Sequence, residues 1–481
     1  MKISDIIYRE EYILSEVAED LEFNELKTRL EEINKGDILI VPNSQKTPDF
    51  SKVKALPLAV ICDTNAILPD NICAIRVEKP RLAMAKAFFR YYNPNLENMK
   101  IIGLTGTNGK TSTATMIRKV LSDSGYKTGF IGTGKIDIDG KEINDINYSM
   151  TTPDPDILYR ALRKMSDAEC TAVIMEVSSH ALALDKVAPL IFDYGIFTNM
   201  SKEHTDFHGN MSSYFAAKLK LFDLCRCGIF NIDDEYSKRA YELCNTRKIS
   251  AGIIWRGDCW ATNIETHGFD GVDYIYHQRN FSFKMKLSLP GIYNTYNSML
   301  AAALCIDMDC KPCSVKNSLE HISNISGRYE IIKDKITVII DYAHTPSAFE
   351  SILKDLALVK GDKRLKVVFG CGGNRDREKR PMMAKIAEKY ADKIIVTADN
   401  SREEQIKDII CDIIRGFERG IYEIIENRAD AITEAIVNSS DGEIIAIIGK
   451  GPEKYNIDSS GYHPFDEKEI ISSALQIRNQ K

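Results

Sequence analysis

The chain has 481 residues, of which 44% are hydrophobic and 27% charged, a composition typical of soluble globular proteins. This length suggests about three domains, and the net charge of -6 argues against nucleic acid as a partner, because phosphate backbones bind to basic surfaces. No apolar run is long enough for a signal peptide or a transmembrane span, so we expect a cytoplasmic protein without membrane insertion. The twelve cysteines are scattered, which favours reduced thiols over disulfides or a zinc site.

The first segment, residues 1–97, is weakly patterned. Short apolar runs at 37–41, 58–62 and 73–77 predict strands between polar turns, and a helix is expected from Arg81 to Tyr92. The sequence Asn93-Pro-Asn-Leu that follows is typical of a linker. We therefore place a first domain boundary at 97.

Two further α/β domains are predicted after this boundary. Over 98–323, apolar runs at 101–105, 128–131, 172–177, 194–198 and 228–232 alternate with helical stretches, which indicates parallel β-α units with helices on both sheet faces. A polar, alternating region near 250–290 predicts an antiparallel extension. Over 324–481 a second set begins, with strands at 337–341, 366–369, 393–397 and 443–448 and helices at 381–390 and 428–437.

The strongest motif is Gly103-Leu-Thr-Gly106-Thr-Asn-Gly109-Lys110-Thr111, which follows a predicted strand and opens a helix. Glycines allow successive backbone N–H groups to point at phosphate oxygens, and the helix adds its positive end. Lys110 supplies a point charge and Thr111 a ligand for Mg²⁺. The loop alone indicates only a nucleoside triphosphate site, which a kinase, a switch GTPase or a ligase could each have.

Three further positions are candidates for chemistry near this loop. Glu176 ends a predicted strand at the sheet edge where the loop lies, and a carboxylate there suits Mg²⁺. His204 belongs to an acidic and imidazole cluster after the next strand. Lys218 follows two alanines and an aromatic residue on a predicted helix, where partial burial would favour the neutral amine; the alternative is an ordinary surface lysine.

The order of these motifs resembles the Mur ligase family, and within it the MurE type. The resemblance is carried by GLTGTNGKTST, TTPDPD, MEVSSHAL, FTNMSKEHTDFHG and AAKLKLF, and further on by ISGRYE, VIIDYAHTPSAFE and VVFGCGGNRDREKRP. It implies an α/β fold with the three-domain Mur ligase architecture: an N-terminal UDP-substrate-binding domain (1–97), a central P-loop ATPase domain (98–323) and a C-terminal Rossmann-like domain that binds the amino acid (324–481).

The resemblance also implies a reaction. It is ATP-dependent amide bond formation through an acyl-phosphate, which adds meso-diaminopimelate to UDP-N-acetylmuramoyl-L-alanyl-D-glutamate in peptidoglycan precursor synthesis. ATP and Mg²⁺ are the implied cofactors, with Lys218 carbamylated by CO₂. The implied partners are these small-molecule substrates, and the implied oligomeric state is a monomer.

Site residues follow from the same resemblance. The implied catalytic residues are Lys110, Lys218, Glu176 and His204. The implied metal ligands are Thr111, Glu176, His204 and the carbamate of Lys218. ATP is expected at Gly106, Thr107, Asn108, Gly109, Lys110, Thr111, Ser112, Asn294, Arg328 and Asp341. The UDP substrate is expected at Thr151, Thr152, Ser178 and Lys186, and the amino acid at Arg375, Asn400, Arg402, Gly449 and Glu453.

Two parts of this reading leave alternatives open. Asp399-Asn400-Ser401-Arg402 is similar to the family motif for diaminopimelate, whose second carboxylate an arginine can bind and lysine lacks, but Ser401 and Pro452 replace the usual proline and histidine. L-lysine or another amine is therefore the alternative. The N-terminal segment lacks the Asp-Ser-Arg motif of many relatives, with Asn43, Ser44, Gln45 and Thr47 as possible substitutes. A paralogue acting on a non-cell-wall carboxylate is a further alternative, and a small-molecule kinase or a non-catalytic nucleotide-binding protein is a remote one.

Overall fold

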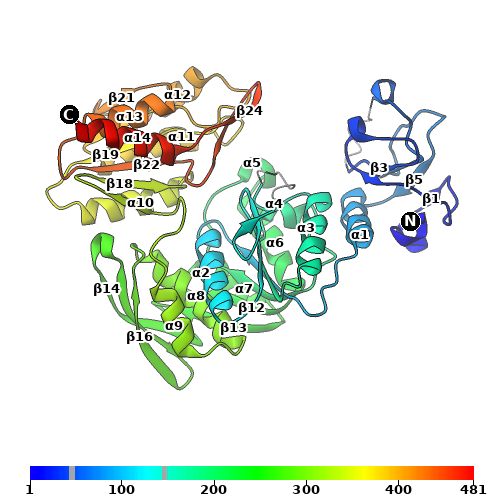
Figure 1. Cartoon of the computed structure of the whole chain (residues 1–481), viewed down its shortest axis with the longest axis horizontal. Helices are drawn as coiled ribbons and strands as arrows, with labels where there is room; N and C mark the ends of the chain where they lie inside the picture. Colours follow the sequence, from blue (N-terminus) through cyan, green and yellow to red (C-terminus); the bar gives the residue numbers. More distant parts are fainter. Residues whose placement is uncertain (43–48, 144–147, 149, 481) are drawn as a thin grey trace.

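The computed structural model describes residues 1–42, 49–143, 148 and 150–480. It consists of three regions in chain order, each with its own sheet (Figure 1). Within these described ranges, no helix is both long and apolar enough to cross a membrane. The uridine-site candidates Asn43, Ser44, Gln45 and Thr47 lie outside the described residues.

The N-terminal region has a five-stranded sheet in the order β1-β5-β4-β3-β2, in which only β1 is antiparallel to its neighbour. A helix, α1 (Pro80–Tyr92), follows the sheet; it starts with proline in its first turn and ends where Asn93 takes a left-handed φ of +43°. The predicted helix is thus confirmed. The strands are β1 (Leu14–Ser15), β2 (Leu26–Lys27), β3 (Ile38–Ile40), β4 (Ala59–Asp63) and β5 (Ala74–Val77).

Helix α1 packs against α3 (Pro155–Asp167) of the central region and joins the two regions. The rings of Phe89 and Tyr159 meet edge to face with centroids 5.5 Å apart, and Arg163 donates hydrogen bonds to the carbonyls of Tyr92 and Asn93, both at 3.3 Å. Buried side chains of β3 to β5, α1 and α3 belong to one continuous hydrophobic cluster. The segment after α1, expected as a linker, is therefore held against the central region.

The central region has an eleven-stranded sheet in the order β16-β15-β14-β13-β12-β11-β6-β10-β7-β8-β9. The strands from β14 to β7 are parallel, and antiparallel strands extend both ends, as predicted for 250–290. The strands are β6 (Lys100–Thr105), β7 (Thr128–Gly132), β8 (Lys135–Ile138), β9 (Lys141–Glu142), β10 (Ala172–Glu176), β11 (Phe192–Phe197), β12 (Cys225–Asn231), β13 (Arg247–Gly252), β14 (Cys259–Thr266), β15 (Val272–Gln278) and β16 (Phe281–Leu287).

Helices cover both faces of this sheet, and successive residues of β6 show it: Ile101 joins one hydrophobic cluster and Ile102 the other. The second cluster contains α2, α8 and α9, and the first contains α3 and α6. The helices not yet bounded are α2 (Lys110–Asp123), α4 (Ser179–Ala183), α5 (Thr205–His208), α6 (Met211–Asp223), α7 (Glu235–Leu243), α8 (Tyr293–Asp307) and α9 (Pro312–Glu320).

The C-terminal region has a six-stranded sheet in the order β17-β18-β22-β19-β20-β21, parallel except for β17. Helices α10 to α12 pack on one face and α13 and α14 on the other. The elements are β17 (Glu330–Lys333), β18 (Thr337–Asp341), α10 (Pro346–Val359), β19 (Leu365–Phe369), α11 (Lys379–Tyr390), β20 (Lys393–Val396), α12 (Ile406–Ile414), β21 (Tyr422–Ile424), α13 (Arg428–Val437), β22 (Ile444–Ile448), β23 (Tyr455–Asp458), β24 (Gly461–Pro464) and α14 (Glu467–Gln480).

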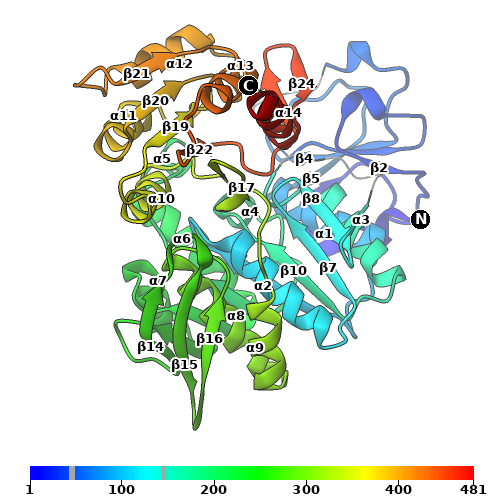
Figure 2. The same ribbon diagram turned by 60° about the vertical axis from the view of Figure 1, so that its left-hand side comes forward.

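The C-terminal region lies beside the carboxyl ends of the central strands, near α5 (Figures 1 and 2). Ser347 at the start of α10 hydrogen-bonds Ser201, which follows β11, at 2.9 Å. The site that the sequence predicts at this edge of the central sheet is therefore bordered by two regions.

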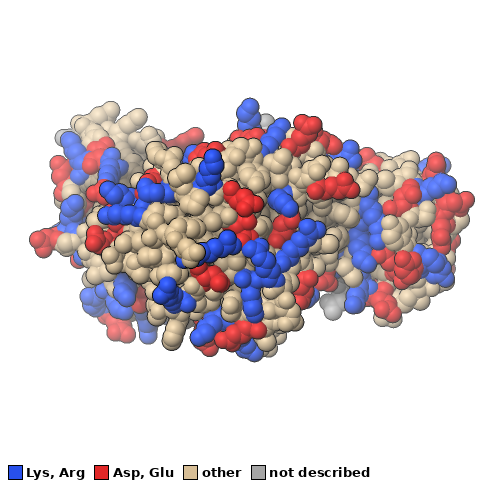
Figure 3. Space-filling model, turned by 90° about the horizontal axis from the view of Figure 1, so that it is seen from below, with Lys and Arg blue, Asp and Glu red and all other residues tan. Residues whose placement is uncertain are grey.

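Acidic and basic side chains are interspersed on the lower face of the molecule (Figure 3).

A groove of about 430 Å³ beside β13 and β15 is lined by several cations, among them Arg247 and Arg279. Asp307 pairs with both, at 2.7 Å from Arg247 Nη1 and 3.6 Å from Arg279 Nη2. The positive charge of this groove is thus partly neutralised within the protein.

Candidate active site

The phosphate loop connects β6 to α2, and its glycines are required by the backbone. Gly106 and Gly109 have φ values of +148° and +84°. A Cβ atom at Gly106 would lie 1.9 Å from Thr198 Oγ1, and one at Gly109 would lie 2.6 Å from Asn297 Oδ1. The loop can therefore keep this path only with glycine, and its N–H groups stand at the positive end of a 14-residue helix.

Lys110 folds back over this loop. Its ammonium donates to the carbonyls of Gly106 at 2.8 Å and Thr107 at 3.0 Å. Burial lowers the pKa of Lys110, while the negative charges of Glu176 and Glu203 raise it. The loop thus presents a cation and backbone donors in one place.

Segments after β11 hold the loop in shape. Thr198 Oγ1 donates to the Asn108 carbonyl at 2.6 Å, and the Asn108 N–H donates to Asn199 Oδ1 at 2.9 Å. The hydroxyls of Thr107 and Tyr214 lie 3.1 Å apart. The Thr107 side chain and the Asn108 backbone are therefore positioned, and Ser112 is buried in the first turn of α2.

Glu176 ends β10 and is only 1% exposed. Its Oε2 accepts a hydrogen bond from Thr133 at 3.2 Å, but Oε1 has no hydrogen-bond partner in the described part of the chain. A buried carboxylate oxygen without a partner is costly, and a cation would satisfy it. This orphaned oxygen fits a Mg²⁺ ligand.

His204 has a left-handed φ of +55° and belongs to a cluster of aromatic and charged groups. Its ring centroid lies 4.7 Å from that of His180, and its Nε2 lies 3.6 Å from Glu203 Oε2. Burial lowers the pKa of His204 to about 4, although Glu203 opposes this shift. The ring is therefore neutral near pH 7 and can offer a lone pair to a metal.

Lys218, on α6, is only 1% exposed, so it is not a surface lysine. Its ammonium nitrogen lies 4.6 Å from the centroid of the Tyr214 ring, and no carboxylate of the described residues forms an ion pair with it. Burial and the charge of Lys110 hold its pKa well below the usual range, against the opposing charges of Glu203 and Asp234. Burial therefore favours the neutral amine, which is one of the two alternatives that the sequence leaves open.

The residues expected as metal ligands do not form a complete cage by themselves. In the ranges that the structure describes, no group of three or more His, Cys, Asp or Glu side chains is arranged to hold a metal. Mg²⁺ in nucleotide sites commonly takes one or two protein ligands and completes its shell with phosphates and water. Glu176 and Thr111 at the loop fit that pattern.

Asn294 is buried and uses its side chain within the protein. Its Nδ2 donates to the Pro290 carbonyl at 2.7 Å, and its Oδ1 accepts from Asn297 at 3.0 Å. Asn297 in turn accepts from Thr113 at 3.2 Å. The pair links α8 to the helix of the phosphate loop.

Arg328 and Asp341 bring the C-terminal region to this loop. Arg328 Nη2 donates to Thr111 Oγ1 at 3.0 Å, and its guanidinium lies 4.3 Å from the centroid of the Tyr342 ring. Both Asp341 oxygens accept from backbone amides, those of Tyr329 at 2.6 Å and Ala343 at 2.7 Å. Burial raises the pKa of Asp341 and Arg328 opposes it. Asp341 thus fixes the turn that carries Arg328.

The four positions expected near the UDP substrate cluster beside Glu176. Thr152 Oγ1 donates to the Glu176 carbonyl and accepts from the Ser178 N–H, both at 2.9 Å. Thr151 and Thr133 hydroxyls lie 3.2 Å apart. Lys186 is buried, with its ammonium 2.7 Å from Asp154.

The five positions expected near the amino acid gather in the C-terminal region. Asn400 Nδ2 donates to Glu453 Oε2 at 2.8 Å. Gly449 has a φ of +126°, and a Cβ atom there would lie 2.8 Å from Asp399 Oδ2, so glycine is required for this close approach. Arg402 is half-buried and donates to backbone carbonyls, while Arg375 is exposed. Burial and the charge of Arg375 lower the pKa of Arg402. Neither guanidinium forms an ion pair with a described residue, so both can receive an anion.

Three residues that belong to these sites were not predicted. Glu203 contacts His204 and the C-terminal His344, whose Nε2 lies 3.2 Å from Glu203 Oε1. Lys450 is buried beneath Asn400. Each lies near a residue that the sequence analysis singled out: Glu203 in KEH, His344 in DYAH and Lys450 in GKGPE. Only the tertiary structure reveals the partners of these three side chains.

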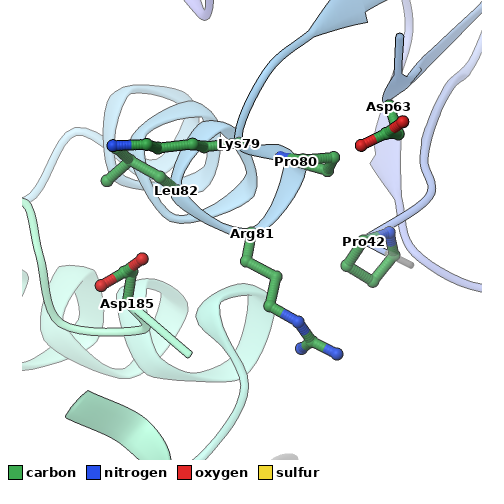
Figure 4. Close-up of a pocket in the computed structure, with 7 residues that line it drawn as sticks. All are labelled: Pro42, Asp63, Lys79, Pro80, Arg81, Leu82 and Asp185. Carbon is green, nitrogen blue, oxygen red and sulfur yellow. The ribbon is translucent and has the colours of Figure 1, made fainter. Parts of the chain in front are cut away.

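A cavity of about 280 Å³ lies where the N-terminal region meets the central region (Figure 4). It opens at the start of α1, and Lys79 and Arg81 leave the helix there in different directions (Figure 4). Its lining residues are Pro42, Asp63, Lys79, Pro80, Arg81, Leu82 and Asp185. Cations at a helix N-terminus are suited to phosphate groups.

A phosphate loop at the edge of a parallel sheet, contacted by an arginine from a second α/β region, defines a multidomain P-loop nucleotide-binding protein. Two family models match the chain: the Mur ligase middle domain over residues 104–305, and the Mur ligase, glutamate ligase domain over residues 327–451. The chain belongs to the Mur ligase family, as its motifs indicated.

Curated relatives support this assignment over most of the chain. A UDP-N-acetylmuramoyl-L-alanyl-D-glutamate–2,6-diaminopimelate ligase 1 of Clostridium acetobutylicum is 38% identical over 87% of this chain and 86% of its own. The ligase of the same name, without the number, from Clostridioides difficile is 36% identical over 99% of both chains.

Solved structures share the fold over all or much of the chain. A UDP-N-acetylmuramoyl-L-alanyl-D-glutamate–2,6-diaminopimelate ligase superposes with a TM-score of 0.68 at 24% identity, covering 100% of both chains. Mycobacterium tuberculosis folylpolyglutamate synthase with ADP and AMPPCP has a TM-score of 0.64 at 17% identity, over 76% of this chain and 92% of its own. The predicted α/β Mur ligase architecture is confirmed.

Proposed function

We propose that this protein is an ATP-dependent ligase that adds meso-diaminopimelate to UDP-N-acetylmuramoyl-L-alanyl-D-glutamate in peptidoglycan precursor synthesis. The names of its full-length relatives support both substrates. The observation that carries the chemistry is the burial of Lys218, which is 1% exposed and whose pKa is lowered by that burial and by the charge of Lys110. A protein that only binds nucleotide has no need of such an amine.

The first step joins substrate and phosphate. The terminal carboxylate of the UDP substrate attacks the γ-phosphorus of ATP, a new O–P bond forms, and the bond to ADP breaks. Lys110, Arg328 and the loop amides stabilise the charge that develops on the phosphoryl oxygens. The fit of Glu176 to a cation supports a role for Mg²⁺, which would neutralise phosphate charge when bound.

Lys218 is proposed to carry a carbamate. Its neutral nitrogen would add to CO₂ with loss of one proton, which converts an amine into a carboxylate-type ligand. Thr111, Glu176, His204 and this carbamate are the proposed metal ligands. The lowered pKa values of His204 and Lys218 support this assignment, because both groups must be unprotonated to act.

In the second step the incoming amine attacks the acyl carbon and a C–N bond forms. The acyl C–O bond to phosphate breaks, phosphate leaves with the bridging oxygen, and the amine nitrogen loses a proton. Arg402 and Arg375 are the proposed contacts of the amino acid's carboxylates, with Asn400, Gly449 and Glu453 at its far end. Two guanidinium groups without an ion-pair partner among the described residues favour a substrate with two carboxylates over L-lysine.

The UDP end is proposed to bind at the cavity where α1 meets the central region. Arg81 and Lys79 supply charge for the diphosphate there, in a segment that lacks the family's serine motif. Thr151, Thr152, Ser178 and Lys186 are the proposed contacts for the muramoyl-peptide. Replacing Arg81 by Ala is expected to raise KM for the UDP substrate and not for ATP; an unchanged KM would remove Arg81 from the site.

The test is phosphate release from ATP and Mg²⁺ with UDP-N-acetylmuramoyl-L-alanyl-D-glutamate, in the presence of meso-diaminopimelate, L-lysine or neither. We expect release that requires diaminopimelate, with a tripeptide product of matching mass. Phosphate release that requires L-lysine instead would identify L-lysine as the incoming amino acid. No release with any amine, from protein that binds ATP, would favour a paralogue that acts on another carboxylate.

We further propose a monomer in the cytoplasm, where ATP is available.

A further inference from the structure

Lys450 is a fully buried cation in the C-terminal region, just after β22, with 0% of its surface exposed. Its ammonium donates hydrogen bonds to Asn400 Oδ1 at 2.8 Å and to the Tyr455 carbonyl at 2.7 Å. Asp399 and Glu453 lie 3.8 and 3.7 Å away. Asn400, Asp399 and Glu453 lie in the loops after β20 and β22, which carry most of the proposed amino-acid contacts, while the charges of Arg428 on α13 and Glu467 on α14 also act on this ammonium.

Packing alone does not explain a lysine at this position. Removing an ammonium from water is costly, and an apolar side chain of similar volume is often as stabilising in a buried ion-pair site. Burial accordingly lowers the pKa of Lys450, although Asp399 and Glu453 oppose this. The reason for the charge must therefore lie in the groups to which the ammonium donates.

The Asn400 amide is one of these groups, and Lys450 fixes its orientation. Two donors, the Lys450 ammonium and the Ile457 N–H at 3.0 Å, point to the same side-chain atom of Asn400. That atom must be the amide oxygen, since an amide nitrogen cannot accept them. The amide nitrogen then faces Glu453 and donates to its Oε2 at 2.8 Å.

The Glu453 carboxylate is held at both oxygens as a result. Oε2 takes the Asn400 amide, and Oε1 takes the Tyr342 hydroxyl at 3.2 Å. Without Lys450 the amide oxygen would keep only the Ile457 N–H as a donor, so the contact of the amide nitrogen with Glu453 would be held less firmly. The order of dependence runs from Lys450 to Asn400 to Glu453.

We propose that Lys450 is a positioning residue for the amino-acid site, which holds the Asn400 amide and thereby the Glu453 carboxylate in the orientation that receives the far end of the incoming amino acid. The proposal rests on the proposed function, because Asn400 and Glu453 are its proposed substrate contacts. Lys450 acts through these two residues and sets the affinity for the amine, with no part in ATP binding.

The experiment compares Lys450→Met with wild type in the full-length enzyme, with KM measured separately for meso-diaminopimelate, ATP and the UDP substrate. We expect KM for diaminopimelate to rise at least tenfold and the other two to change less than twofold. Lys366→Met is the matched control, since Lys366 is also buried and donates to the Ala435 carbonyl at 2.9 Å, on β19 away from Asn400. It should leave all three KM values unchanged.

A cycle with Asn400→Ala tests the order of dependence. If Lys450 acts through Asn400, the double variant should have the diaminopimelate KM of Asn400→Ala alone. Lys450→Arg, which keeps N–H donors, should recover part of the loss, and Lys450→Gln takes the place of Lys450→Met if the latter is insoluble. Additive effects, an unchanged diaminopimelate KM, or an equal rise in all three KM values would overturn the proposal. Wild-type enzyme with no amine-dependent release would instead overturn the proposed function.

Discussion

His344 of the C-terminal region places its Nε2 3.2 Å from Oε1 of Glu203 in the central region. Burial would raise the pKa of Glu203, but His344 and the nearby positive charges hold it well below its usual range. The carboxylate next to the proposed metal ligand His204 is thus held by a side chain from another sheet. Contact between the two regions and the shape of the ATP site are therefore coupled.

Replacing His344 by Ala should lower kcat about ten- to a hundredfold, because a hydrogen bond to a charged group is worth about 1.5–3 kcal/mol and about 1.4 kcal/mol corresponds to a factor of ten. Steady-state kinetics at saturating substrates would measure it. Ser347→Ala, which removes the exposed hydrogen bond to Ser201, is the control and should cost less than threefold. Equal losses in both variants would show that His344 has no special role.

Lys218→Ala should abolish ligation, with kcat reduced by at least about a hundredfold, because the amine is proposed to become a metal ligand. Short-chain carboxylic acids added to the assay should restore part of the activity by replacing the missing carbamate. Phosphate release at increasing acid concentration is the measurement. Lys119→Ala, at an exposed pair with Asp123 on α2, is the control and should retain wild-type rates and show no rescue. Full activity of Lys218→Ala would rule out the carbamate.

Arg402→Ala should raise KM for meso-diaminopimelate and leave KM for ATP unchanged, since the guanidinium lies among the proposed amino-acid contacts of the C-terminal region. If the Arg–carboxylate pair is buried in the complex, its loss should cost about 2–5 kcal/mol. Competition between diaminopimelate and L-lysine would report the loss of selectivity directly. Arg415→Ala, which breaks a pair with Asp412 at the surface, provides the comparison. A parallel rise in KM for ATP would remove Arg402 from the selectivity argument.

Gly109→Ala and Gly125→Ala separate backbone strain from crowding at the phosphate loop. Both glycines have φ near +90°, but a Cβ at Gly109 meets Asn297 Oδ1 at 2.6 Å and one at Gly125 meets nothing within 4 Å. Each variant should lose about 1–3 kcal/mol of stability from strain. Only Gly109→Ala should weaken ATP binding more than tenfold in calorimetry. Similar ATP affinities in the two variants would contradict a steric requirement in the loop.

Glu11 links the N-terminal segment to α1 through Lys86 at 2.8 Å and Arg90 at 2.9 Å. Burial would raise its pKa, but these hydrogen bonds lower it to about 2. A carboxyl group whose pKa is lowered in the folded state stabilises the fold at pH values above its pKa in the unfolded chain, which is near 4.5 for Glu11. This contribution is lost as the pH falls toward 2. The partial exposure of Glu11 reduces the contribution to about 1–2 kcal/mol at pH 7.

Urea unfolding of Glu11→Gln at several pH values measures this contribution. The variant should be less stable than wild type at pH 7, and the difference should shrink as the pH falls below about 4.5. Glu10→Gln, at an exposed neighbouring position, should match wild type throughout. A pH-independent difference for Glu11→Gln would mean that the charge of Glu11 is not responsible.

Local patterns were sufficient to predict much of this molecule. Each strand is a single stretch of sequence, so apolar runs predict β6, β10 and β11. The spacing of the glycines likewise predicts the loop from Gly106 to Thr111. The pattern around Lys218 left both a partly buried amine and a surface lysine open, because the residues of one helix do not show what packs against it; the structure shows that Lys218 is buried. The chemistry of Glu176 depends on an unpartnered oxygen, which no pattern contains.

Other features depend on contacts between distant residues. Glu203 meets His344 across 141 positions, and Lys450 meets Asn400 from another loop, so neither partner can be inferred from its neighbours in sequence. The segment after α1 was predicted as a linker because asparagine and proline interrupt the helix there. The structure shows instead that Arg163 on α3 holds it in place.

The contact of α1 with α3 determines where this enzyme can bend. Because the first two regions share one hydrophobic cluster, separating them would expose apolar surface, so they should move and unfold as a single body. Among the described residues, no cluster of buried side chains includes helices or strands of both the central and C-terminal regions, and only the partly buried Phe269 and Tyr293 of the central region pack against the C-terminal core. Any opening that admits ATP and releases product is therefore expected between α9 and β17, with the C-terminal region moving as a unit and the proposed UDP-binding end staying in place.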